Sequence, residues 1–141
     1  MKVYVDIGHG ERGDPGAVSG SFVEHQMNIK VAHAFADRMK QHGWEVKIEQ
    51  GNLEMGDSAR AANSWGADLL LSFHFNAGGG DRGEVIYSWE SGALELANAV
   101  AEGLKKAGQT VVRVYQSKAN STGTAEYFGI LRVSKMPAVI V

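Results

Sequence analysis

The order of apolar and polar residues along the chain predicts alternating strands and helices. Short runs rich in β-branched residues are typical of strands, and apolar residues repeated every three or four positions are typical of helices that bury one face. The pattern predicts strands over residues 3–7, 44–48, 69–75, 84–89, 111–114 and 138–141, and helices over residues 24–42, 53–65 and 91–107. This order predicts a single α/β domain over residues 1–141, with a largely parallel, twisted central sheet of about six strands and helices on both faces.

Glycines mark the ends of helices and the loops between elements. Gly43 and Gly66 follow the first two predicted helices, where a residue in the left-handed conformation commonly ends a helix. Glycine-rich or polar stretches predict loops over residues 8–20, 51–56, 78–83 and 116–128. Glycine-rich loops after strands are common binding regions in α/β proteins, so the first of these loops is a candidate for chemistry.

Composition restricts the classes of function. The chain has 141 residues, of which 44% are apolar and 21% charged, and this suits one globular domain. Its formal charge of −2 offers no basic field for nucleic acid, and no apolar run is long enough to span a bilayer. Cysteine is absent, so any metal must be held by histidines and carboxylates. The first residues show no signal peptide, and we expect a protein made in the cytoplasm.

Two histidines and one glutamate stand where a metal site is expected. His9 follows the first strand, and His74 lies near the end of the most apolar strand. Ligand sites of open α/β sheets lie at the carboxyl ends of the strands, so these two imidazoles can converge. Glu24 begins the first long helix, after a loop long enough to return to the same edge. Two imidazoles and one carboxylate are a ligand set of catalytic zinc.

Glu24 has a second interpretation. Ser21 and Glu24 match a capping box, in which Ser21 is the N-cap residue and Glu24 stands three positions later. The local sequence favours this cap, and each histidine alone is equally compatible with a hydrogen-bonded loop residue. The residues by themselves therefore leave the metal site open. The three histidines on the first helix are not expected to be ligands: His25, His33 and His42.

Residues 8–13 also match G-x-G-x-x-G directly after a strand, which is the pattern of dinucleotide-binding sites. In such sites the glycines open a helix, and an acidic residue ends the next strand. Here the sequence Asp14-Pro15-Gly16 follows and the helix begins well downstream. We therefore interpret the match as accidental.

Five segments, taken in chain order, resemble the zinc-dependent N-acetylmuramoyl-L-alanine amidases of the Amidase_3 type, found in bacterial autolysins and phage endolysins: DIGHGERGDPGA, VEHQMNIKVA, SARAANSWGADLLLSFHFNA, GEVIYS and ILRVSKMPAVIV. The resemblance implies zinc ligands at His9, Glu24 and His74, and it replaces the capping role of Glu24. Supporting roles around the metal loops are implied for three further polar residues: Arg60, Asn63 and Asn76. The implied reaction is hydrolysis of the amide between N-acetylmuramic acid and L-alanine in peptidoglycan.

The sequence departs from this family's pattern after Val141. In the family the last strand continues into a glutamate that acts as general acid/base, and a closing helix follows. Neither Glu84 nor Glu126 matches that position, so we expect no catalytic acid/base within the chain. The departure is compatible with a truncated chain of an active amidase and with a naturally short, weakly active or inactive form that binds wall material. A related zinc peptidase is a further alternative.

The resemblance also sets expectations for partners and localisation. Peptidoglycan is the expected partner, with no nucleic acid and no membrane span. Because the family segments begin close to Met1 without a leader, we expect a phage or prophage endolysin that acts at the cell wall rather than a secreted autolysin. Such endolysins often carry a separate wall-binding domain, which this sequence does not show.

Overall fold

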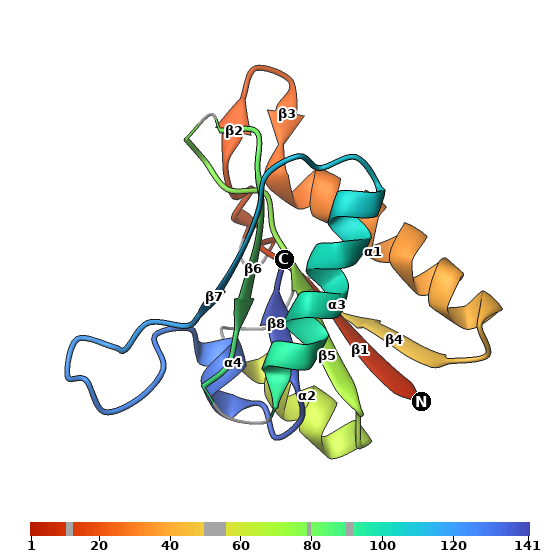
Figure 1. The fold of residues 1–141 in the computed structure, drawn as a ribbon, viewed down its shortest axis with the longest axis vertical. Helices are drawn as coiled ribbons and strands as arrows, with labels where there is room; N and C mark the ends of the chain where they lie inside the picture. Colours follow the sequence, from red (N-terminus) through yellow and green to blue (C-terminus); the bar gives the residue numbers. More distant parts are fainter. Residues whose placement is uncertain (11–12, 50–55, 79, 90–91) are drawn as a thin grey trace.

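A computed structural model describes residues 1–10, 13–49, 56–78, 80–89 and 92–141. Six strands form one sheet in the order β4-β1-β5-β8-β6-β7 (Figure 1). Their bounds are Lys2–Ile7 for β1, Glu45–Glu49 for β4, Leu69–Phe73 for β5, Gly83–Tyr87 for β6, Val112–Gln116 for β7 and Ala138–Ile140 for β8. The first four strands in this order are parallel, and β6 pairs antiparallel with β8. The predicted α/β domain with a largely parallel sheet of six strands is confirmed.

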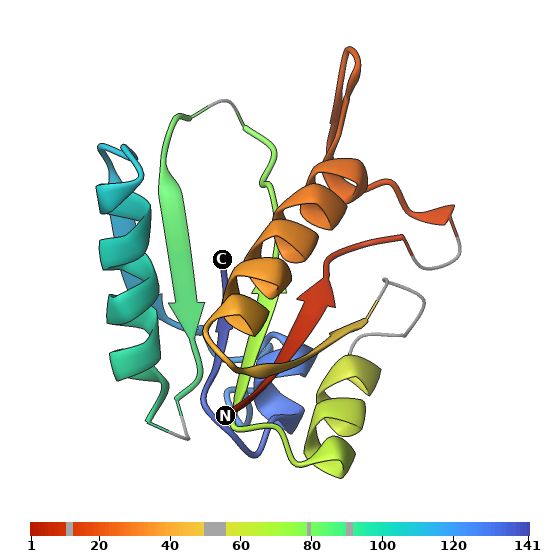
Figure 2. The same cartoon turned by 90° about the vertical axis from the view of Figure 1, so that its right-hand side faces the viewer.

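Helices cover both faces of the sheet (Figure 2). One core joins α1 (Glu24–Gln41) and α3 (Ala93–Lys106) to one face of the sheet, and the other core joins α2 (Asp57–Trp65) and α4 (Gly129–Val133) to the opposite face. Alternation along the strands supplies both cores. In β1, Val3, Val5 and Ile7 pack in the first core, and Tyr4 packs in the second.

Glycines end the first two helices as expected. The backbone of Gly43 has φ 79°, and its N–H donates to the carbonyl of Lys40 at 2.9 Å. Gly66 has φ 72° and closes α2. The predicted helix at 53–65 is confirmed from Asp57 onward, and its first three positions lie outside the described residues, as does residue 91 of the helix predicted at 91–107. These two helix ends could be predicted from the sequence because glycine readily adopts the left-handed conformation that ends a helix.

Two local elements were not predicted. A hairpin of β2 (Val18–Ser19) and β3 (Phe22–Val23) projects at the carboxyl end of the sheet, and α4 follows the loop that was predicted at 116–128 (Figure 1). Strands of two residues and a helix of five are too short to show a hydrophobic period. The strand predicted at 69–75 ends earlier, at Phe73, so His74 and Phe75 lie just beyond it.

The pairing of β1 with β5 places two loops side by side. Ile7 lies opposite Phe73 in the parallel register, and the N–H of Gly8 donates to the carbonyl of Phe73 at 3.1 Å. On the other side of β5, the N–H of His74 donates to the carbonyl of Val141 at 2.8 Å. The residues that follow β1, β5 and β8 therefore lie together at one edge of the sheet, which is formed by the carboxyl ends of these strands. Among the described helices, none has the length and apolar character needed to cross a membrane.

Candidate metal centre

Three potential ligands converge at this edge of the sheet. His9 comes from the loop after β1, Glu24 from the first turn of α1, and His74 from the residue after β5. One ligand atom from each lies within 4.8 Å of the other two. The two imidazole rings are 5.0 Å apart between centroids and meet nearly edge to face, with an interplanar angle of 77°. Residues far apart in the sequence thus form one compact group of two nitrogens and a carboxylate.

Glu24 is held at the centre of this group. Its Oε1 accepts the N–H of Phe75 at 2.9 Å, and its Oε2 accepts the N–H of Ala17 at 2.8 Å. The side chain is almost fully buried. Burial alone would raise the pKa of Glu24, but the two N–H groups and the neighbouring imidazoles of His9 and His74 outweigh it and hold that pKa below its ordinary value. Glu24 is therefore a buried carboxylate that stays ionised.

The capping box expected at the start of α1 is wrong. Val23 occupies the N-cap position and makes no side-chain cap hydrogen bond, since Phe22 and Val23 form a strand of the hairpin. Glu24 is the first helical residue and not the third, so its carboxylate points to the loops at the sheet edge and not back to Ser21. The local pattern was matched, but the hairpin takes the backbone positions that the cap requires.

His9 is oriented by a neighbouring carboxylate. Its Nδ1 lies 2.8 Å from Oδ2 of Asp14, whose Oδ1 accepts the N–H of Gly16 at 2.9 Å. The hydrogen bond from His9 lowers the pKa of Asp14, so Asp14 is ionised and accepts a hydrogen bond from Nδ1–H of His9. The Nε2 lone pair of His9 then faces Oε1 of Glu24 at 3.1 Å. His9 adopts φ 64°, a left-handed conformation that costs about 1–3 kcal/mol in a residue other than glycine.

His74 completes the group through Nδ1, whereas His9 faces Glu24 through Nε2. Nδ1 of His74 lies 3.2 Å from Oε1 of Glu24. Burial and the nearby His9 lower the pKa of His74, while the carboxylates of Asp6 and Glu24 act in the opposite direction. His74 is therefore neutral at neutral pH, which is the form that can donate a lone pair to a metal.

Two glycines allow the loops to approach. A Cβ added at Gly8 would lie 2.6 Å from the carbonyl oxygen of Phe73 and closer still to the ring of His74. A Cβ added at Gly16, whose φ is 68°, would lie 2.6 Å from the ring of His9 and 2.9 Å from Oε2 of Glu24. These glycines are required because the backbone itself forms the wall of the site.

The carbonyl of Gly8 is fixed from α1. Both Nδ1 of His25 and Nδ2 of Asn28 lie 3.0 Å from this carbonyl oxygen. Asn28 is fully buried. As expected from the sequence, His25 does not belong to the group of potential ligands, and it serves to hold the loop that carries His9.

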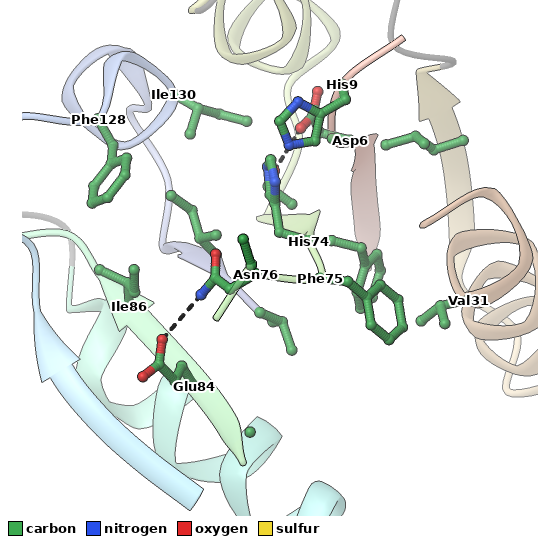
Figure 3. A pocket seen from close by; sticks show the side chains of 18 of the residues that line it. Asp6, His9, Val31, His74, Phe75, Asn76, Glu84, Ile86, Phe128 and Ile130 are labelled. Carbon is green, nitrogen blue, oxygen red and sulfur yellow. Dashed lines mark hydrogen bonds between the residues drawn. The ribbon is translucent and has the colours of Figure 1, made fainter. Parts of the chain in front are cut away.

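A pocket of about 840 Å³ opens beside this group and is lined by His9 and His74. Figure 3 shows Asp6, His9 and His74 together on one side of it. The apolar side chains of Ile86, Phe128 and Ile130 line another part of the wall. The pocket is within the range of 300–1,000 Å³ that is usual for ligand sites.

A polar group stands across the pocket from the ligands (Figure 3). Glu84 accepts hydrogen bonds from Nδ2 of Asn76 at 3.0 Å, from Nε of Arg82 at 2.7 Å and from the hydroxyl of Tyr115 at 3.3 Å. The hydrogen bond and charge of Arg82 lead the causes that lower the pKa of Glu84. Asn76 thus connects the loop after His74 to β6.

Arg60 and Asn63 lie on α2, away from these contacts. Arg60 pairs with Oδ1 of Asp57 at 2.5 Å on the exposed face of the helix. Asn63 donates to the carbonyl of Val133 at 2.8 Å and accepts from the N–H of Lys135 at 2.9 Å, so it joins α2 to the segment after α4. Support of the metal loops by Arg60 and Asn63 stays a prediction.

The donor set fits a metal of the zinc type. With Asp14 accepting a hydrogen bond from Nδ1–H of His9, Nε2 of His9 and a carboxylate oxygen of Glu24 face each other at 3.1 Å, an arrangement in which both can bind one cation. Two imidazole nitrogens and one carboxylate oxygen, with no sulfur, suit zinc with one position left for water. The carboxylates of Asp6 and Asp14 beside this group were not singled out from the sequence. The only signal for Asp14 was its place in the DPGA segment.

Comparisons with known proteins agree on one family. Residues 3–141 match the family described as N-acetylmuramoyl-L-alanine amidase. The N-acetylmuramoyl-L-alanine amidase CwlM of Bacillus licheniformis is 28% identical over 99% of this chain and 54% of its own length. The endolysin of Bacillus phage SPP1 is 28% identical over 98% of this chain and 52% of its own length. The chain thus spans about half the length of these curated relatives.

A solved structure shares the fold. The catalytic domain of CwlV, an N-acetylmuramoyl-L-alanine amidase from Bacillus (Paenibacillus) polymyxa var. colistinus, superposes with a TM-score of 0.77 at 25% identity. The match covers 99% of this chain and 77% of that chain. Sequence and structure comparisons therefore confirm the family resemblance drawn from the sequence.

Proposed function

The chain belongs to the N-acetylmuramoyl-L-alanine amidase family, and from this premise we propose that it is a zinc-dependent hydrolase of the amide between N-acetylmuramic acid and L-alanine in peptidoglycan. The observation that carries the proposal is the convergence of His9, Glu24 and His74, with ligand atoms within 4.8 Å of one another, beside a pocket that the two histidines line. The names of the relatives, an amidase and an endolysin, support the same reaction at the cell wall.

Each residue of the centre has a definite task in this proposal. A bound zinc supplies a Lewis acid for the amide carbonyl and lowers the pKa of a water ligand to about 7. His9 offers Nε2 because Asp14 holds the proton on Nδ1. His74 offers Nδ1 in its neutral form, and Glu24 contributes the negative charge. The backbone bonds to Glu24 keep the carboxylate in place before the metal arrives.

The pocket supports a substrate with both apolar and polar parts. Its wall combines Ile86, Phe128 and Ile130 with the hydrogen-bonded group around Glu84. A muramyl peptide presents a sugar with an apolar lactyl group on one side of the scissile amide and a charged peptide on the other. A pocket of about 840 Å³ admits the groups next to that amide but not a whole glycan strand, so most of the polymer would lie on the open surface.

The reaction is tested by digestion of purified peptidoglycan in the presence of zinc. An amidase releases new L-alanine N-termini without new reducing sugar ends. Release of other amines would favour the zinc peptidase alternative, and co-sedimentation without any release would favour a wall-binding module. Either of these two results would overturn the proposed reaction.

The metal is tested separately by the zinc content of the purified chain. We expect one zinc per chain, lost in His9→Ala and in His74→Ala. The matched control is His33→Ala, because His33 is an exposed histidine of α1 outside the group of ligands. A folded native chain without zinc affinity would contradict the site.

A further inference from the structure

Asp6 is a buried carboxylate that the proposed reaction does not use. It lies on β1, three positions before His9, and only 9% of its surface is exposed. Its side chain lines the same pocket as His9 and His74, and Figure 3 shows the three together. Its place beside His9 and His74 makes it a candidate for an electrostatic role.

Both oxygens of Asp6 are held by hydroxyl groups. Ser58 of α2 donates to Oδ1 at 2.6 Å, and Ser72 of β5 donates to Oδ2 at 2.6 Å. Both serines are buried. These bonds tie the carboxylate, which lies on the strand that leads to His9, to helix α2 and to the strand that leads to His74. They give each oxygen one donor but contribute no positive charge.

A buried carboxylate without a counter-charge destabilises a protein, because its ionised form loses the solvation of water. Within the described part of the chain, no lysine or arginine forms an ion pair with Asp6. The charge of Asp6 does act on the ring of His74, where it favours a positive charge. The negative field of Asp6 is therefore directed at the place where a cation would bind.

The charges of the three ligands leave a divalent cation incompletely balanced. His9 and His74 bind metals as neutral imidazoles, and Glu24 contributes a single negative charge. Asp14 adds a second carboxylate, but half of its side chain is exposed to water, which screens it. Asp6 is the buried carboxylate outside the ligand set that lines the same pocket, and burial preserves its field.

We propose that Asp6 is a positioning residue of the metal centre, whose buried negative charge, fixed by Ser58 and Ser72, raises the affinity of the three ligands for a divalent cation. This inference rests on the proposed function, because it assumes that His9, Glu24 and His74 hold the metal. It assigns Asp6 no contact with metal or substrate. The charge matters more in this role than the hydrogen bonds, and the two can be separated by mutation.

The test measures zinc affinity with zinc alone, by competition with a chromogenic chelator. In Asp6→Asn, which keeps the shape and removes the charge, we expect the affinity to fall about 10–100-fold, as for other residues that support metal ligands. In Ser58→Ala and Ser72→Ala, which keep the charge, we expect a smaller loss, within about threefold of the native affinity. Equal losses in all three variants would show that the hydrogen-bond network matters and not the charge.

Thermal unfolding of the metal-free chains separates this role from a structural one. Metal-free Asp6→Asn should unfold at the same temperature as the native chain or higher, because it removes an uncompensated buried charge. A lower unfolding temperature, or failure to fold, would assign Asp6 to the fold and overturn the inference. Native zinc affinity in Asp6→Asn would overturn this inference alone, whereas absence of zinc binding in the native chain would overturn the proposed function as well.

Discussion

The hydrogen bond between His9 and Asp14 makes a sharp prediction for the variant Asp14→Asn. Asp14 is ionised and accepts from Nδ1 of His9 at 2.8 Å, and this leaves Nε2 free to bind the metal. An asparagine can place its oxygen toward His9 or toward the N–H of Gly16, but not toward both. If the amide nitrogen faces His9, the imidazole must carry its proton on Nε2, which is the form that cannot bind zinc there.

The size of the effect follows from the exposure of the pair. Removal of a group that supports a metal ligand commonly lowers affinity or activity about 10–100-fold. The side chain of Asp14 is 49% exposed, so water partly replaces the lost acceptor. We therefore expect the lower end of that range, about a tenfold loss of zinc affinity. Asp14→Ala should lose more, because it also removes the bond to Gly16 in the loop that carries the Ala17 N–H to Glu24.

Zinc affinity is measured by competition with a chelator, at a pH near neutrality and fixed ionic strength. The matched control is Asp37→Asn, which removes the same charge from an exposed position on α1. Asp37→Asn should bind zinc like the native chain, since surface charges at a distance are screened. If Asp14→Asn binds zinc within about twofold of the native chain, the orientation of His9 by Asp14 is refuted.

Three further predictions concern the same edge of the sheet. Gly8→Ala should cost about 1–3 kcal/mol of unfolding free energy and weaken zinc binding, because its Cβ meets His74; unchanged denaturant midpoint and affinity would contradict this. The pKa of His74 in the folded chain is lower than its ordinary value of 6.5. At pH values between the lowered pKa and 6.5, the unfolded chain therefore binds more protons than the folded chain. The metal-free chain should therefore have its full stability above about pH 6.5 and lose part of it at lower pH. The unfolding temperature of His74→Gln should depend less on pH, and an equal pH dependence in the two chains would contradict this contribution of His74. A residue directly after Val141 lies beside His74, whose N–H donates to the Val141 carbonyl, and chains with glutamate at that position should hydrolyse peptidoglycan about 10²–10⁴-fold faster than matched chains with glutamine there; equal rates would contradict this.

The sequence predicted the fold well because the long elements have clear periods. The helix at 24–42 was placed within one residue, as α1 spans Glu24–Gln41, and the apolar run from Leu69 marked the central strand. Elements without a period were missed. The β2–β3 hairpin has strands of two residues, and its effect was large, since it removed the capping box and turned Glu24 toward the sheet edge.

The candidate site could be predicted only in part, for a physical reason. The two histidines were selected by residue type and by their place after strands, which the parallel pairing of β1 with β5 then brought together, whereas the family resemblance gave Glu24 its expected role as a ligand. The supporting contacts depend on side-chain direction across the sheet. Asp6 and Ser72 are paired on neighbouring strands, and their side chains lie on the face of the sheet that α2 covers, where Ser58 meets them. No spacing in the sequence indicates that the hydroxyl of a helix residue reaches the carboxylate of a strand residue.

The arrangement of charges indicates why so polar a group is stable at the edge of the sheet. Glu24 is almost fully buried, yet its pKa is held low by backbone N–H groups, so the carboxylate stays charged next to lone pairs of His9 and His74. The same imidazoles lie 3.1 and 3.2 Å from Glu24 and favour its negative charge, and in the proposed metal-bound form all three residues would be ligands. A metal that binds only the folded chain stabilises it by about 2.7 kcal/mol at a concentration of 100 times its dissociation constant. In the proposed metal-bound form, folding of the loops and binding of the metal would therefore be coupled through the same residues, among them His9 with its left-handed backbone.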